Sequence, residues 1–117
     1  MSDNPHFFTY FAKSSVEDGV YKIGCSRNPI SREKTMKGGY KRYQFKVTHF
    51  IVGCNEYMIL DALFRANVKT PLWINPRSHR YREAVYLSEE EANHIIEKCG
   101  FIPISQFEDF ANREEYE

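Results

Sequence analysis

A run of cations in the first half of the chain is the feature best suited to chemistry on a charged partner. Between Lys22 and Lys46 eight residues are basic and only Glu33 is acidic. The basic residues are Lys22, Arg27, Arg32, Lys34, Lys37, Lys41, Arg42 and Lys46. Clustered cations attract phosphate groups, so nucleic acid is a candidate partner. The alternative is an ordinary solvated face, and charge alone does not decide between the two.

The end of the chain has the opposite charge. Residues 88–117 contain nine acids against Lys98 and Arg113, and the whole chain of 117 residues has a formal net charge of zero. A protein with zero net charge is not expected to bind along nucleic acid non-specifically through its overall charge. We therefore expect local attraction by the basic segment and an acidic tail that limits non-specific binding.

The most specific pattern is the stretch 21–32, YKIGCSRNPISR, in which Arg32 follows Gly24 by eight positions. Phe8-Thr9-Tyr10 precedes it, Glu56 follows at the start of a predicted helix, and residues 82–87 are REAVYL. Together these motifs resemble the GIY-YIG nuclease superfamily, in the phage and large-DNA-virus branch where the second motif is KIG-x-[ST]-x-x-P-x-x-R. The resemblance covers roughly residues 7–96.

The resemblance implies a metal-dependent endonuclease that cleaves or nicks DNA. It assigns Tyr10 and Lys22 to the strand positions near the attacking water, Arg32 to the scissile phosphate and Glu56 to a Mg²⁺ or Mn²⁺ ion. Magnesium suits a single carboxylate completed by water and substrate oxygens. The other cations expected to contact nucleic acid are Arg27, Lys34, Lys37, Lys41 and Arg42. We expect the four site residues to share one face of a sheet and to point into one cleft.

Two positions depart from the family pattern. Phe8 replaces the glycine of the first motif, and Lys22 replaces the tyrosine of the second. Because side chains alternate along a strand, Tyr21 points away from Lys22 and cannot supply the missing phenol. The identity of the base therefore stays open, and Asp61 and Glu83 are the alternative carboxylates for the metal.

The same departures favour a second function class. In it the chain is a catalytically degenerate nucleic-acid-binding module, or a viral assembly or structural protein that keeps the fold. The chain has no room for the separate DNA-binding domain to which such nucleases are usually tethered. DNA versus RNA, sequence preference and oligomeric state are left open.

The elements that would position these residues follow from turn and cap chemistry. We predict strands at 6–13, 20–24 and 45–52, and helices at 29–37 and 55–67, with Asn28-Pro29 starting the first helix. A loop covers 69–80, and a strand (82–87) and helix (88–99) follow, with Ser88 and Glu91 forming a capping box. The predicted fold is α/β (α+β): a three-stranded mixed or antiparallel sheet flanked by helices, with a C-terminal strand–helix appendage. Residues 1–100 form the domain, and residues 101–117 an acidic tail that contains at most a short helix.

The sequence also indicates where in the cell the protein is expected to be located. No apolar run approaches the ~20 residues that span a bilayer, and the N-terminus lacks signal-peptide character. We expect an intracellular protein that is not secreted and does not bind membranes, in the host cytoplasm or nucleus if the source is viral. Cys25, Cys54 and Cys99 are widely spaced and odd in number, so we expect reduced, mostly buried thiols and neither a disulfide framework nor a zinc site.

Overall fold

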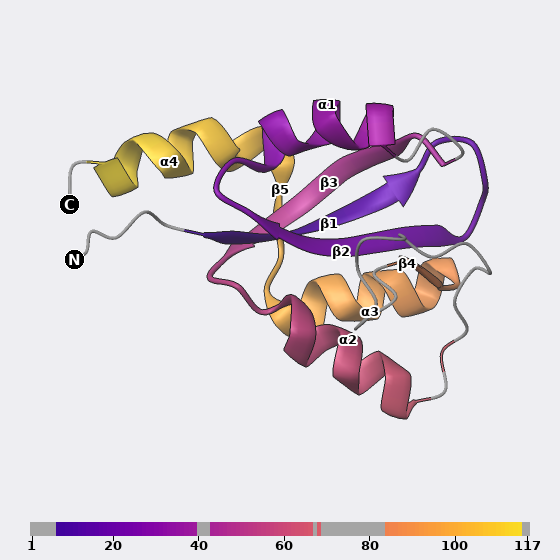
Figure 1. Ribbon diagram of the computed structural model, residues 1–117. Coiled ribbons are helices and arrows are strands. Elements are labelled where there is room, and N and C mark those ends of the chain that lie inside the picture. Colours follow the sequence, from indigo (N-terminus) through magenta and orange to yellow (C-terminus); the bar gives the residue numbers. More distant parts are fainter. Residues whose placement is uncertain (1–6, 40–42, 67, 69–83, 116–117) are drawn as a thin grey trace.

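Three long strands form the centre of an antiparallel sheet (Figure 1). The computed structural model describes residues 7–39, 43–66, 68 and 84–115. Strand β1 (Phe8–Ser14) lies between β2 (Val20–Ser26) and β3 (Phe45–Val52) and is antiparallel to both. The predicted order of strand, strand, helix, strand, helix is confirmed, as is the general α+β class.

Among the described residues the sheet has five strands, so the prediction of three was wrong. Strand β4 (Ala84–Tyr86) pairs with β2, and β5 (Ile102–Pro103) pairs with β3, which gives the order β4-β2-β1-β3-β5. These edge strands have three and two residues, too few for an alternating pattern to reveal. The predicted appendage and tail are thus parts of the same sheet.

Helices cover both faces of this sheet (Figure 1). Helices α1 (Pro29–Gly39) and α4 (Phe107–Glu115) lie on what we call the first face. Helices α2 (Glu56–Arg65) and α3 (Glu89–Cys99) lie on the second face. Residues on the first face include Tyr10, Ala12 and Val47, which pack with Met36 of α1.

The second face has its own core. It contains the strand side chains of Phe11, Tyr21 and Ile23, which pack against α2 and α3. Because consecutive strand residues alternate between faces, Tyr21 and Lys22 point in opposite directions, as predicted. The C-terminal residues close one end of the first face, where Phe107 packs edge-on against Phe8.

Local chemistry sets the helix ends. The Asn28 carboxamide oxygen accepts hydrogen bonds from the backbone amides of Ile30 and Ser31, both at 3.1 Å, which caps α1. The predicted capping box of α3 is present, because Ser88 and Glu91 exchange side chain–backbone bonds of 3.0 and 2.8 Å.

A β-bulge in β3 fixes α1 to the sheet. The pairing of β1 with β3 shifts register between Phe11 and Ala12, and the Thr48 hydroxyl donates to the Phe11 carbonyl at 3.1 Å. The backbone amide of Val47 donates instead to the carboxylate of Glu33 at 2.7 Å. The single acid of the basic segment therefore attaches α1 to β3.

Part of the sequence analysis concerns residues outside this description. The predicted loop 69–80 lies there, as do Lys41, Arg42 and Glu83, and the side chains of Lys37 and Glu56 are likewise not described. Within the described ranges, no helix has the length and apolar character needed to cross a membrane.

Candidate nucleic-acid site at one end of the sheet

Both site-bearing helices begin at the same end of the sheet. The last residues of β2 and β3, Ser26 and Val52, each pair with Phe8 at the start of β1. Helix α1 follows β2 after two residues and α2 follows β3 after three. Helix N-termini carry partial positive charge, so this sheet end combines two such termini and favours anions.

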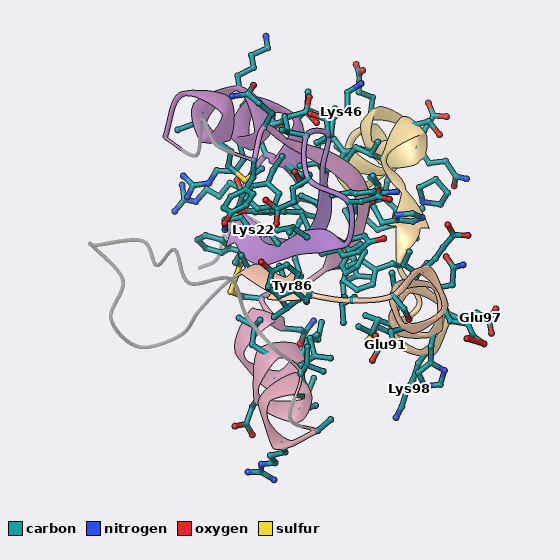
Figure 2. All side chains as sticks on the ribbon, turned by 90° about the vertical axis from the view of Figure 1, so that its right-hand side faces the viewer. Lys22, Lys46, Tyr86, Glu91, Glu97 and Lys98 are labelled. Atoms are coloured by element: carbon teal, nitrogen blue, oxygen red, sulfur yellow. A yellow bond between two sulfur atoms is a disulfide. The ribbon has the colours of Figure 1, made fainter. Side chains whose placement is uncertain are left out.

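A buried lysine–tyrosine pair lies on the first face near this end. The Lys22 ammonium donates to the Tyr10 hydroxyl at 2.9 Å and lies 5.2 Å from the centre of the Tyr10 ring. Each residue is only 1% exposed. In Figure 2 Lys22 lies within the body of the domain, whereas Glu97 and Lys98 extend outward from α3. The structure therefore brings together two of the four predicted site residues.

Gly24 makes this pair possible. It lies directly opposite Tyr10 in the β1–β2 ladder. A Cβ atom on residue 24 would overlap the ring and hydroxyl of Tyr10. The phenol thus occupies the space above the glycine and reaches along β2 to Lys22. The sequence analysis noted the glycine for its spacing to Arg32 but not for this contact.

Arg32 lies on the sheet-facing side of α1. Met36, one turn further along, is fully buried in the same cluster as Tyr10, and Pro29, one turn earlier, is also fully buried. Arg32 itself is half-buried, and its Nε atom is buried. The spacing from Gly24 to Arg32 therefore places the guanidinium above the face that carries the lysine–tyrosine pair.

Glu56 belongs to the opposite layer. It begins α2, whose residues Ile59 and Leu60 pack into the second-face core. We expected Arg32 and Glu56 to lie above the same face of the sheet. This prediction was wrong, because α1 covers the first face and α2 the second, although both helices start at the same end of the sheet. The Thr9 hydroxyl fixes that start, accepting from the Asn55 amide at 2.7 Å and donating to the Gly53 carbonyl at 2.6 Å.

Tyr10 and Lys22 do not face the expected cleft in the described part of the chain, because both side chains are covered. Two hollows among the described residues, of about 370 and 470 Å³, lie on the other side, near α3, and are lined by residues such as Val68 and Leu87. The sequence could not indicate this, since burial depends on how α1 packs on the sheet.

The basic segment is divided between surface and interior. Arg27, Lys34 and Lys46 are exposed, as expected of residues that contact nucleic acid. Lys22 is buried and cannot belong to that surface without a conformational change. The Arg27 guanidinium lies over the ring of Phe7 at 5.2 Å from its centre.

A disulfide corrects the prediction of reduced thiols. Cys25 and Cys54 are bonded, with 5.6 Å between their Cα atoms, whereas Cys99 is free and half-buried. The pairing follows from the shared end: Cys25 precedes the last residue of β2, and Cys54 follows the end of β3 by two residues. The two cysteines are 29 residues apart in the sequence, and this separation does not indicate that they are in contact.

The metal expectation rests on Glu56. In the part of the chain that the structure describes, no group of three or more His, Cys, Asp or Glu side chains is placed to hold a metal ion. Asp61, one alternative carboxylate, forms an exposed ion pair with Arg65 at 3.1 Å on α2. A Mg²⁺ ion held here would depend on one carboxylate, water and substrate oxygens.

Comparisons with known proteins give no family. No protein-family model, no curated protein and no solved structure matches this chain.

Proposed function

We propose that this protein is a metal-dependent endonuclease that nicks DNA, with its reacting phosphate bound at the sheet end where α1 and α2 begin. The observation that carries the proposal is the buried hydrogen bond from Lys22 to Tyr10 on the sheet face that α1 covers. The GIY-YIG resemblance selects the same residues from the sequence. The proposal joins these two lines of support.

The burial of Lys22 argues for a function. Removing an ammonium ion from water costs several kcal/mol, and apolar residues of similar size usually pack at least as well. A lysine kept at 1% exposure is therefore a poor choice for stability alone. Strongly desolvated charges with a specific hydrogen-bond partner are concentrated at functional sites.

The pair has a definite chemical capacity. The Tyr10 oxygen accepts a hydrogen bond from the ammonium, so its own hydrogen remains available to donate or transfer. The positive charge beside this oxygen also stabilises negative charge that develops on a neighbouring phosphate. In this proposal the Tyr10 hydroxyl orients the attacking water by a hydrogen bond, and Lys22 positions the phenol.

Arg32 supplies the contact to the scissile phosphate. A guanidinium presents several donors in a fixed plane and binds phosphate oxygens in pairs. The neighbouring N-terminus of α1 adds the partial positive charge of the helix dipole, and the first turn of α1 contains no acid. A divalent ion held by Glu56 would neutralise charge on the leaving oxygen.

Two arginine variants and one lysine variant test the assignment. Arg32→Ala should lower both DNA affinity and the nicking rate. Arg32→Lys should keep much of the affinity but not the rate, because it lacks the planar fork. Lys34→Ala, an exposed cation two residues later, is the matched control and should change only the salt-dependent affinity. Equal losses in the Arg32→Ala and Lys34→Ala variants would contradict the role of Arg32.

A second function is favoured by the covering of Tyr10 and Lys22. With both side chains 1% exposed, substrate reaches them only after a conformational change. If no such movement occurs, the chain binds nucleic acid without cutting it, or uses the fold in assembly. Steeply salt-dependent binding with no cleavage would support the binding module, because phosphate contacts release counterions.

A further inference from the structure

Phe7 and Arg27 form an exposed aromatic–cation pair at the same end of the sheet. Phe8 pairs with Ser26, so Phe7 and Arg27 lie just beyond this end of β1 and β2. The Arg27 guanidinium lies 5.2 Å from the centre of the Phe7 ring. Despite this contact Phe7 remains 43% exposed, and Arg27 is exposed as well. The backbone that carries the ring is held in place, since the Phe7 carbonyl accepts from the Gly53 amide at 2.7 Å.

We propose that this pair is a stacking platform for an unpaired nucleotide of the substrate, next to the cleaved phosphate. The inference rests on the proposed function, because it names the kind of nucleic acid that the same site takes. Aromatic rings bind bases by stacking, and arginine beside them contacts the adjoining phosphate. Bases in intact duplex DNA are stacked on one another and cannot lie flat on a protein ring. The expected substrate is therefore single-stranded or locally unpaired.

The position of the pair supports this assignment. Phe7 precedes Tyr10 by three residues, a separation of about 10 Å along an extended strand. Because the spacing is odd, Phe7 is directed toward the second face and Tyr10 toward the first, so a base on Phe7 would lie at the shared sheet end on the side where α2 begins.

Tyr86 provides a matched control within the same sheet. It is 40% exposed and belongs to β4, where it pairs with Val20 at the opposite end of β2. The six residue steps from Val20 to Ser26 place it about 20 Å from the platform. Its ring has similar size and exposure but lies away from the proposed site.

Binding of three fluorescent probes tests the proposal: a single-stranded oligonucleotide, the same strand with abasic positions, and its duplex. Abasic sites keep the phosphates and remove the bases, so they separate stacking from charge. The wild type should bind the complete single strand about 10-fold more tightly than the abasic strand. Phe7→Ala should remove this preference, Phe7→Trp should retain it, and Tyr86→Ala should leave it unchanged. Arg27→Ala should weaken binding to both single strands and reduce the salt dependence by about one counterion.

The outcomes separate this inference from the proposed function. A wild type that binds none of the probes at low salt overturns both. A wild type that binds, but in which Phe7→Ala retains the preference for the complete strand, overturns the platform alone. Preference for the duplex over both single strands also overturns it, while leaving a duplex nuclease intact.

Discussion

The substitution Tyr10→Phe removes one oxygen atom and tests how much the buried Lys22–Tyr10 hydrogen bond contributes to the free energy of unfolding. Tyr10 and Lys22 are each 1% exposed and are joined at 2.9 Å, so water cannot replace the lost bond without entering the core. The ring of phenylalanine fills the same space above Gly24. Packing is thus preserved and the hydrogen bond to the ammonium is the main change.

The magnitude follows from the charge on the donor. Hydrogen bonds to charged groups contribute about 1.5–3 kcal/mol, more than neutral ones. We expect Tyr10→Phe to lower the free energy of unfolding by about 2 kcal/mol. At about 2.1 cal/mol/K per residue, unfolding of 117 residues has an entropy near 0.25 kcal/mol/K. The melting temperature should therefore fall by about 8 °C.

Thermal unfolding followed by circular dichroism measures this shift, and Tyr21→Phe is the control. Tyr21 occupies the neighbouring strand position on the second face, where its ring stacks on Phe11 at 5.2 Å between centres. The control should lose less than about 0.5 kcal/mol. Equal melting temperatures for Tyr10→Phe and the wild type would refute the bond. A larger loss in the Tyr21→Phe variant would show that the two faces were assigned wrongly.

Three further predictions follow from the described contacts. Gly24→Ala should cost about 1–3 kcal/mol, because its Cβ displaces the Tyr10 ring, and chemical denaturation measures the loss. Cys54→Ser should lower the free energy of unfolding by about 3.6 kcal/mol relative to the oxidised wild type. This is the chain-entropy value for a disulfide that closes a loop of 29 residues. Equal denaturation midpoints for the two proteins would contradict the Cys25–Cys54 bond. Burial lowers the pKa of His49 below its ordinary value of 6.5, so the unfolded chain takes up a proton that the folded chain resists. Stability should fall as pH decreases below about 6.5 and level off below the folded pKa, and His49→Gln should reduce that slope.

The sequence predicts local structure well in this chain. The cap bonds of α1 and α3 join residues no more than three positions apart. The local sequence, Asn28-Pro29 in one case and Ser88 with Glu91 in the other, therefore locates the starts of both helices. The alternation of strand side chains likewise separates Tyr21 from Lys22.

The remaining features depend on contacts between distant residues. A helix after β3 can cover either face of a sheet, and its apolar stripe does not reveal which, so the layer of Glu56 was predicted wrongly. The bond from the Val47 amide to Glu33 requires a bulge that no motif marks. The edge strand β5 is recognisable only once Ile102 is seen beside Phe50.

The candidate site, too, was predictable from the sequence only in part. Family resemblance selects Tyr10, Lys22 and Arg32 from their spacing, but the covering of the first two depends on the packing of α1. Phe7 and Arg27 carry no motif, and only the register of β1 with β2 brings them together.

Conversion of supercoiled plasmid to nicked circles tests the central proposal most directly. Wild type and Glu56→Gln should be compared in Mg²⁺, in Mn²⁺ and in chelator, at concentrations where both bind the plasmid fully. The wild type should nick only with metal. Glu56→Gln should bind within about twofold of wild type yet not cut, because glutamine keeps the shape but lacks the charge that a hard cation requires. A folded, DNA-binding wild type that cleaves no supercoiled, linear or single-stranded substrate in either metal would contradict the endonuclease.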